Sequence, residues 1–356
     1  MLIRRRAAVV LATGIVAASA ALLAQSRGNQ PTQPEQRKLT DAQKKEMAAV
    51  VTMVDADMAG QPAPNDLSLA WNHDDLLKAT SNREYVPFIV SMDPSKVTGN
   101  SVTVYWRVVS KDQAAAAAAA ASAGKKDDKS KSRSTYAYED IGTAPVTPGQ
   151  APEKISRSFT VSAGTYDVYV LVKEASSDKK NAPAPKTSIL KQTITVPELW
   201  NDELNTSSVI VADRIDPLPA PLTSQQMIER PYALGAMEIV PAASNKFSKK
   251  SELQPFLLIY NAKTDSANKP DVTVEYNFYS KEAGGEKFFN KTKPQDLNAQ
   301  TLPPQFDFAA GHQLQSGQAV PLATFPEGDY RLEIKVTDKI ANKSVTRDVN
   351  FTVSGS

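Results

Sequence analysis

The sequence contains no cysteine, which excludes disulfide bonds, thiol nucleophiles and a lipid anchor on an amino-terminal cysteine. It has only two histidines, His73 and His312, so a zinc site built from several imidazoles is excluded as well. The motifs of nucleotide-binding loops, serine hydrolases, zinc proteases and EF-hands are absent. We therefore expect no enzyme, no catalytic, metal-binding or cofactor-binding residue, and no cofactor.

The sequence also lacks an excess of charge of either sign. Its 41 basic and 39 acidic residues give a net charge of +2, so no overall field attracts nucleic acid. Hydrophobic residues at 41% and charged residues at 22% are ordinary values for a globular protein. The length of 356 residues is sufficient for two domains, each with its own core. Nucleic acid is therefore not an expected partner.

The amino terminus reads as a signal peptide over residues 1–24. The basic stretch MLIRRR precedes the apolar run AAVVLATGIVAASAALLA, and cleavage after Ala20 or Ala24 fits the small residues there. We expect export to the periplasm or beyond, with residues 25–38 as a flexible linker. The alternative is an uncleaved anchor, because such a run is just long enough to cross a bilayer. Contact with a membrane is expected only in that case.

Residues 39–59 are predicted to form one amphipathic helix. Apolar residues recur at helical spacing until Gly60 and Pro62 end the run; they are Met47, Val50, Val51, Val54 and Met58. Asp55 and Asp57 lie near the end of this helix, where we interpret them as part of a solvated face and not as metal ligands.

From residue 60 onward the pattern changes to alternation with period 2, which indicates β-strands. Segment 86–111 resembles segment 254–281, and segment 164–196 resembles segment 328–353, so the chain contains a diverged tandem repeat. We expect a mainly β protein with two immunoglobulin-like antiparallel β-sandwiches, at 60–197 and 198–356. The low-complexity insertion 111–134 is predicted to be disordered. Its lysines and one arginine leave contact with a polyanion as an alternative.

Residue parity and one short motif indicate which side chains hold these sandwiches together. Trp106 and Tyr276 occupy matching core positions on matching strands, where immunoglobulin-like folds place a large central aromatic residue. A G-x-Y motif begins the penultimate strand of each repeat, and its tyrosines are Tyr166 and Tyr330. We predict that both are tyrosine corners, buried and bonded to backbone through the hydroxyl.

The segments SSVIVADRIDPLP, RPYALGAMEIVPAASNKFSKKSELQPFLLIYNA and LSLAWNHDDLLKATSNREYVPFIVSMD resemble uncharacterised secreted acidobacterial proteins. In that group such immunoglobulin-like segments often stand beside domains related to von Willebrand factor A. The Asp-x-Ser-x-Ser metal motif of the A domain is absent from this sequence. The resemblance implies an exported β protein and carries no catalytic residue.

We expect a structural or protein-interaction role, with an envelope protein as the partner, because tandem sandwiches present strand edges and end loops. The alternative is carbohydrate binding. Tyr105, Tyr169 and Tyr279 alternate away from the predicted core, and exposed rings in a row could stack on polysaccharide. Burial of these rings between the repeats or under the helix is the interpretation that residue propensity favours. An enzyme is a third interpretation, resting on His73 beside Asp74 and Asp75, which read more simply as a loop before a strand.

Overall fold

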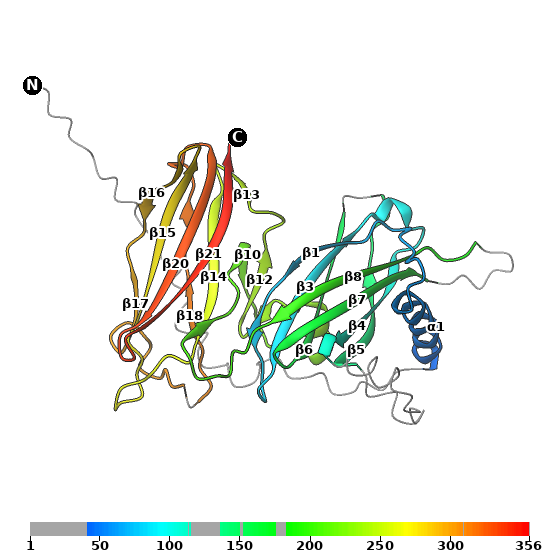
Figure 1. Cartoon of the computed structure of the whole chain (residues 1–356), viewed down its shortest axis with the longest axis horizontal. Helices are drawn as coiled ribbons and strands as arrows, with labels where there is room; N and C mark the ends of the chain where they lie inside the picture. Colours follow the sequence, from blue (N-terminus) through cyan, green and yellow to red (C-terminus); the bar gives the residue numbers. More distant parts are fainter. Residues whose placement is uncertain are drawn as a thin grey trace, which may run out of the picture. The chain divides into compact units, whose positions relative to one another are not determined.

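The computed structural model describes residues 41–112, 114, 136–149, 152–175, 183–308 and 310–355. Its secondary structure is mainly β, arranged as two immunoglobulin-like sandwiches preceded by one helix, which confirms the predicted fold class (Figure 1). The chain divides into two compact units. The N-terminal unit reaches Trp200, and the C-terminal unit follows from Asn201.

The N-terminal unit pairs one helix with two antiparallel sheets. Strand β3 forms the centre of one sheet, with β1 and β2 along one side and β6 along the other; the second sheet has the order β5-β4-β7-β8. The elements are α1 (Asp41–Met58), β1 (Ala70–Asp74), β2 (Leu77–Lys78), β3 (Glu84–Met92), β4 (Ser101–Ser110), β5 (Tyr138–Pro145), β6 (Glu153–Val161), β7 (Gly164–Glu174) and β8 (Thr187–Val196).

The C-terminal unit repeats this plan with two more sheets. One has the order β11-β12-β10-β14-β18, with β9 and β19 also on β14, and the other has the order β13-β21-β20-β15-β16, with β17 on β15. The strands are β9 (Asn205–Thr206), β10 (Ile210–Pro217), β11 (Ala233–Leu234), β12 (Met237–Pro241), β13 (Lys246–Ser248), β14 (Glu252–Tyr260), β15 (Val272–Glu282), β16 (Gly285–Lys291), β17 (Gln295–Leu297), β18 (Leu314–Gly317), β19 (Val320–Pro321), β20 (Gly328–Asp338) and β21 (Lys343–Ser354).

The strands follow the predicted parity, and their inward side chains form one core in each sandwich. In β15 every second residue from Val272 to Phe278 is buried, and the residues between them are partly exposed. Their neighbours across the sheet on β20 alternate in the same way. Sheets with one buried and one exposed face pack in pairs, because only burial of the apolar face removes it from water.

One short segment departs from the order of the sequence. Residues Leu222–Pro231, within the range expected for the second sandwich, belong to the N-terminal unit. They include helix α3 (Ser224–Glu229), which starts with a complete capping box between Thr223 and Gln226 and packs against β6. The Tyr85 hydroxyl donates a hydrogen bond to the carbonyl of Pro231 at 2.9 Å.

Three expectations fall on other parts of the chain. The signal peptide 1–24, the linker 25–38 and nearly all of the insertion 111–134 lie outside the described residues. Within the described residues, no helix combines the length and apolar character needed to span a bilayer.

Candidate protein-interaction surface

Both G-x-Y tyrosines lie at the start of the penultimate strand of their sandwich. The Tyr166 hydroxyl donates to the Ser162 carbonyl at 2.8 Å, and the Tyr330 hydroxyl donates to the Pro326 carbonyl at 2.9 Å. Their side chains are 6% and 2% exposed. This is the geometry of a tyrosine corner.

The glycine of each G-x-Y motif has a backbone reason. Gly164 has a φ of 152° and Gly328 a φ of 148°, values that residues with a side chain rarely adopt. A Cβ atom on Gly164 would also lie 3.4 Å from the Tyr166 ring. The motif is therefore a backbone turn followed by its hydrogen-bonded anchor.

Trp106 and Tyr276 are the buried central aromatics of their sandwiches, at 1% and 0% exposure. Each has a polar atom bonded to the facing sheet. The Trp106 indole N–H donates to the Ser158 carbonyl on β6, and the Tyr276 and Ser316 hydroxyls are 2.7 Å apart between β15 and β18. Burial raises the pKa of the Tyr276 hydroxyl above its usual range.

The structure contradicts the glycan platform formed by Tyr105 and Tyr169. Both rings are buried, at 0% and 7% exposure, in an apolar cluster with Val50 and Val54 of α1. Both tyrosines lie on the face of the sheet away from the sandwich core, as expected, but α1 covers that outer face. Alternation reveals two faces of a strand, and it does not reveal a third layer over the second face.

Ion pairs fasten α1 to this sheet. Arg107 on β4 lies 2.5 Å from Asp55 on α1 and 2.8 Å from Glu139 on β5, and its guanidinium stacks on the Tyr136 ring at 3.9 Å. Lys173 on β7 lies 2.6 Å from Glu46 on α1. Asp55 is thus the partner of a buried arginine and does not belong to a purely solvated face.

Among the residues that the structure describes, no helix lies over the equivalent outer face of the C-terminal unit. Where the N-terminal unit has the apolar residues Tyr105, Tyr169 and Leu171, matching strand positions carry Glu275, Glu333 and Lys335. These residues are partly exposed. These charged side chains favour a face that is open to solvent, because a helix packed over the face would remove their water without supplying partners.

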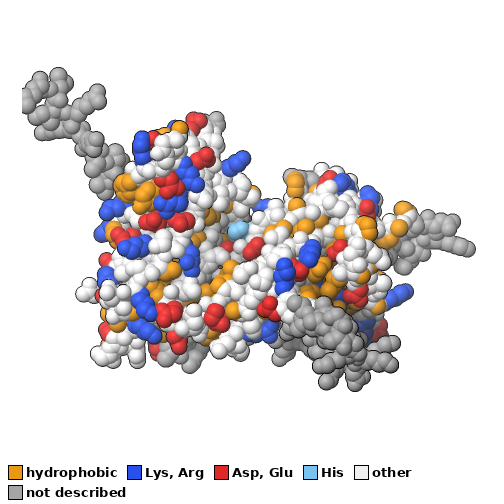
Figure 2. Space-filling view, in the orientation of Figure 1, with side chains coloured by type: hydrophobic (Ala, Val, Ile, Leu, Met, Phe, Trp, Pro, Cys, Tyr) orange, Lys and Arg blue, Asp and Glu red, His pale blue; other side chains and the backbone are white. Residues whose placement is uncertain are grey.

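An aromatic cluster lies at one margin of this bare face. Tyr279, the third residue of the expected platform, packs edge-on against Phe288 of β16 with ring centroids 5.9 Å apart. Arg331 lies over the Tyr279 ring at 4.4 Å and pairs with Glu286 at 2.9 Å. Phe288 is 58% exposed, the largest exposure among the big hydrophobic side chains of the described residues. In Figure 2 a hydrophobic patch lies where Figure 1 places β16, flanked by acidic and basic side chains.

Strand β16 is also an open sheet edge. It pairs with β15 on one side, and within the described residues no strand pairs with its other side, where the Asn290 side chain accepts the Lys291 N–H. An uncapped edge offers free N–H and C=O groups to another strand.

A groove of about 290 Å³ adjoins this margin of the face. Its walls include Lys246, Lys281, Asp329, Asn350 and Thr352, from four neighbouring strands of one sheet and the turn before β13. The Thr352 hydroxyl donates to the Asp329 carboxylate at 2.6 Å. Tyr330 and Phe351 also line the groove, so its walls combine aromatic rings with polar side chains of both charges, a mixture that protein interfaces share.

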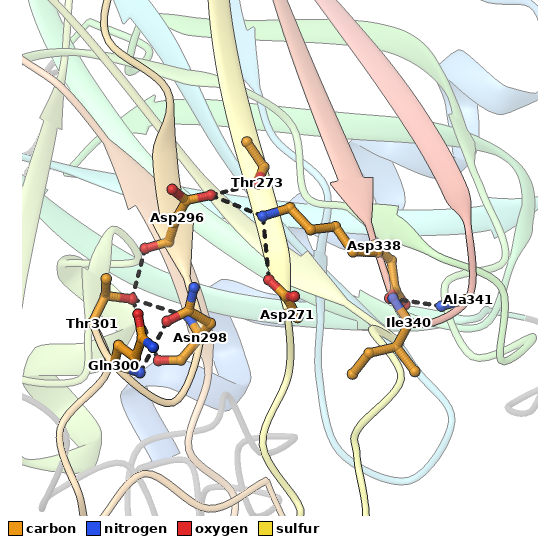
Figure 3. A network of polar contacts seen from close by, with 10 residues as sticks. Asp271, Thr273, Asp296, Asn298, Gln300, Thr301, Asp338, Ile340 and Ala341 are labelled. Carbon is orange, nitrogen blue, oxygen red and sulfur yellow. Dashed lines mark hydrogen bonds and ion pairs between the residues drawn. The ribbon is translucent and has the colours of Figure 1, made fainter.

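The far end of the same sheet is closed by its own polar network (Figure 3). The Lys339 ammonium lies 3.4 Å from Asp271 and 3.1 Å from Asp296, so a lysine neutralises the two carboxylates. The buried Asp338 carboxylate accepts backbone N–H bonds from Lys263, Ile340 and Ala341. Within the described part of the chain, no group of three or more acidic or histidine residues is placed to hold a metal.

Asp338 has a counterpart that the sequence analysis missed. Glu174 ends β7 as Asp338 ends β20, and it accepts bonds from the N–H groups of Thr98 and Lys186 at 2.8 and 3.0 Å. The available signal was the acidic residue ten positions after each G-x-Y glycine. Both carboxylates satisfy backbone donors in the turns at that end of their sandwich.

The two histidines lie in different units. His73 on β1 lies 2.7 Å from the buried Asp75 carboxylate, and the Asp74 carboxylate accepts a bond from the Trp71 indole. Burial acts to lower the pKa of His73, but the carboxylates of Asp75 and Asp74 outweigh it and leave the pKa raised. The ring of His312 accepts the Asp307 N–H at 3.0 Å, which stabilises a turn.

No family model matches this chain, and no curated protein matches it. Among solved structures, it is similar to a trypsin-activated alpha-2-macroglobulin from Escherichia coli, at 10% identity and a TM-score of 0.21. The match covers 83% of this chain and 17% of that protein, so the chain corresponds to a small part of its length.

Proposed function

We propose that this chain is an exported, non-catalytic envelope protein that binds another protein through the open edge of β16. The observation that carries the proposal is Phe288, which is exposed on an edge strand and lies beside Tyr279 and Arg331. Exposed aromatic residues and arginines are enriched at protein interfaces. An open edge also allows an incoming strand to bind through backbone hydrogen bonds.

Export and family membership belong to the same proposal. The basic and apolar amino-terminal sequence supports export. The resemblance to secreted acidobacterial proteins agrees with it. The non-catalytic role rests on the absence of catalytic motifs from the sequence.

Carbohydrate binding loses its main support, because Tyr105 and Tyr169 are buried beneath α1. Tyr279 alone is partly exposed, and one face of its ring is taken by Arg331. Stacking on a sugar chain would need several rings in a row.

A photoreactive amino acid placed at position 288 tests the proposal in the native envelope. The matched control is position 340, because Ile340 is also an exposed apolar residue, at 41%, and lies in the β20–β21 turn. We expect reproducible cross-links from position 288 to one protein, identified by mass spectrometry, and none from position 340. Equal cross-linking from both positions, or a glycan array signal that survives Phe288→Ala, would contradict the proposed site.

A further inference from the structure

The hydrogen bonding of β15 determines which backbone groups of β16 are free. The Thr292 N–H donates to the Tyr276 carbonyl, so the even-numbered residues of β15 bond towards β16. The odd-numbered residues Tyr279 and Lys281 therefore point towards β20, because bonding alternates along an antiparallel strand. Their partners on β16 are Phe288 and Glu286. The N–H and C=O groups of these two residues consequently point outward from the sheet.

We propose that a second copy of this chain binds this edge, with the two β16 strands antiparallel about a two-fold axis at Lys287. The inference rests on the proposed function of β16 as a strand acceptor and names the partner. In this register Glu286 of each copy pairs with Phe288 of the other, so every free N–H and C=O of both residues finds a partner. A two-fold interface requires such self-complementarity.

The side chains fit the same register. Phe288 of one copy lies diagonally across from Phe288 of the other, within reach for aromatic side chains. Lys287 faces its own counterpart, but each Lys287 is already paired with Glu282 across the hairpin, which offsets the repulsion. Lys291 of one copy lies near the hairpin turn at residues 283–284 of the other, beyond the regular part of the contact. The side chains that face each other in the regular part are Lys287 with Lys287 and Phe288 with Glu286.

The register avoids the irregular part of the strand. Phe289 is a bulge residue, and its ring packs towards the core against Phe325 and Tyr330. A partner centred on Lys287 uses only the regular part of β16, next to its hairpin. Bulges end regular pairing at sheet edges, so the bulge limits the contact to one short stretch.

The lack of cysteine allows a direct test by disulfide trapping on the purified full chain. Residues on the axis form a non-hydrogen-bonded pair with Cα atoms about 4.5 Å apart, within the range for a disulfide. The test variant is Lys287→Cys. The control is Lys291→Cys, an exposed lysine on the same strand whose copies would be roughly 26 Å apart in this register.

We expect Lys287→Cys to form a disulfide-linked dimer under mild oxidation at least about tenfold faster than Lys291→Cys, because pairing raises its effective concentration. Equal rates would overturn the inference. Sedimentation equilibrium of the cysteine-free parent should give a dimer mass, and Phe288→Lys should return it to a monomer. A monomeric parent at high concentration would also overturn the inference, while cross-links from position 288 to a different envelope protein would leave the proposed function standing.

Discussion

At the scale of single residues, the tyrosine corners give a stability prediction. Tyr330→Phe keeps the ring stacked on Phe351 but leaves the Pro326 carbonyl without its hydroxyl donor. We expect the free energy of unfolding of the C-terminal unit to fall by about 1 to 3 kcal/mol, measured by urea denaturation. Tyr279→Phe is the control, because the Tyr279 hydroxyl makes only a long hydrogen bond, 3.5 Å to Glu333, at a partly exposed site. Equal losses in the two variants would show that the corner has no special role.

Glu174 gives a prediction for pH dependence. Its burial acts to raise its pKa, but hydrogen bonds from Thr98 and Lys186 outweigh that effect and leave the pKa below its usual value of 4.5. The folded state therefore binds the proton less readily than the unfolded state. The stabilisation is fully present above pH 4.5 and disappears as the pH falls through the lowered pKa.

The Glu174→Gln variant tests this sign. It should be less stable than the parent at pH 7, and the difference in urea midpoint should shrink as the pH falls towards 3. Asp93→Asn should show a difference of the same sign, because hydrogen bonds from Ser95 also lower the pKa of the exposed Asp93 carboxylate. A constant difference between parent and Glu174→Gln across this pH range would contradict the linkage.

At the scale of elements, α1 should detach when a charge is placed in its contact with the sheet. Val54 is completely buried beside Tyr105, so Val54→Asp would bury a carboxylate without a partner. We expect a loss of about 2 to 4 kcal/mol, or release of the helix. Release would appear as rapid protease cleavage within α1. Thr52→Asp, at an exposed position of the same helix, should cost less than about 0.5 kcal/mol.

The strands and the helix were predictable because their patterns are local. The period of 2 from Val272 to Phe278 marks the buried face directly, and the spacing of Val50 and Val54 marks the helix. The sequence left burial of Tyr105 and Tyr169 under the helix and an exposed platform both open, because the two tyrosines look the same whether a helix or water covers them. The bare face carries charge at the matching positions, such as Glu275 and Lys335, and this difference between the repeats was the available signal.

The open edge was not predictable either. Residues 285–291 lie in the region where the two repeats differ, and nothing in their order shows which strand lies next to them. A strand lies at a sheet edge when no further strand pairs with it, so its position depends on the pairing of the whole sheet. Tyr279 was selected correctly as an outward residue, but its contact with Phe288 and Arg331 required the pairing of three strands.

At the scale of the whole molecule, export is the first prediction to check. The mature protein should begin near Ala21 or Gln25, because the basic and apolar segment before them has the form of a cleaved signal. Amino-terminal sequencing of protein recovered from the envelope measures this. A full-length product in the cytosol would remove the argument for an envelope partner, since the chain would not meet one.

The segment Leu222–Pro231 makes one unit depend on a distant part of the chain. Ile228 packs against the core of the N-terminal unit, and Pro231 accepts the Tyr85 hydroxyl bond. Ile228→Ala should therefore destabilise the N-terminal unit, although the residue follows the start of the C-terminal unit in sequence. The expected loss is about 1 to 2 kcal/mol, below that of a fully buried isoleucine, because the side chain is only partly buried.

Hydrogen exchange read by mass spectrometry separates the two units in this experiment. Protection should fall in β3 and β6 of the Ile228→Ala variant and stay unchanged in β15 and β20. The control is Met237→Ala, because Met237 lies on β12 of the C-terminal unit and should lower protection there instead. Loss of protection in β15 and β20 from Ile228→Ala would show that the segment stabilises the C-terminal unit, which contains the residues on both sides of it in the chain. Loss confined to β3 and β6 would mean that the N-terminal sandwich becomes fully stable only after Leu222–Pro231 has been synthesised, although the C-terminal unit starts earlier in the chain.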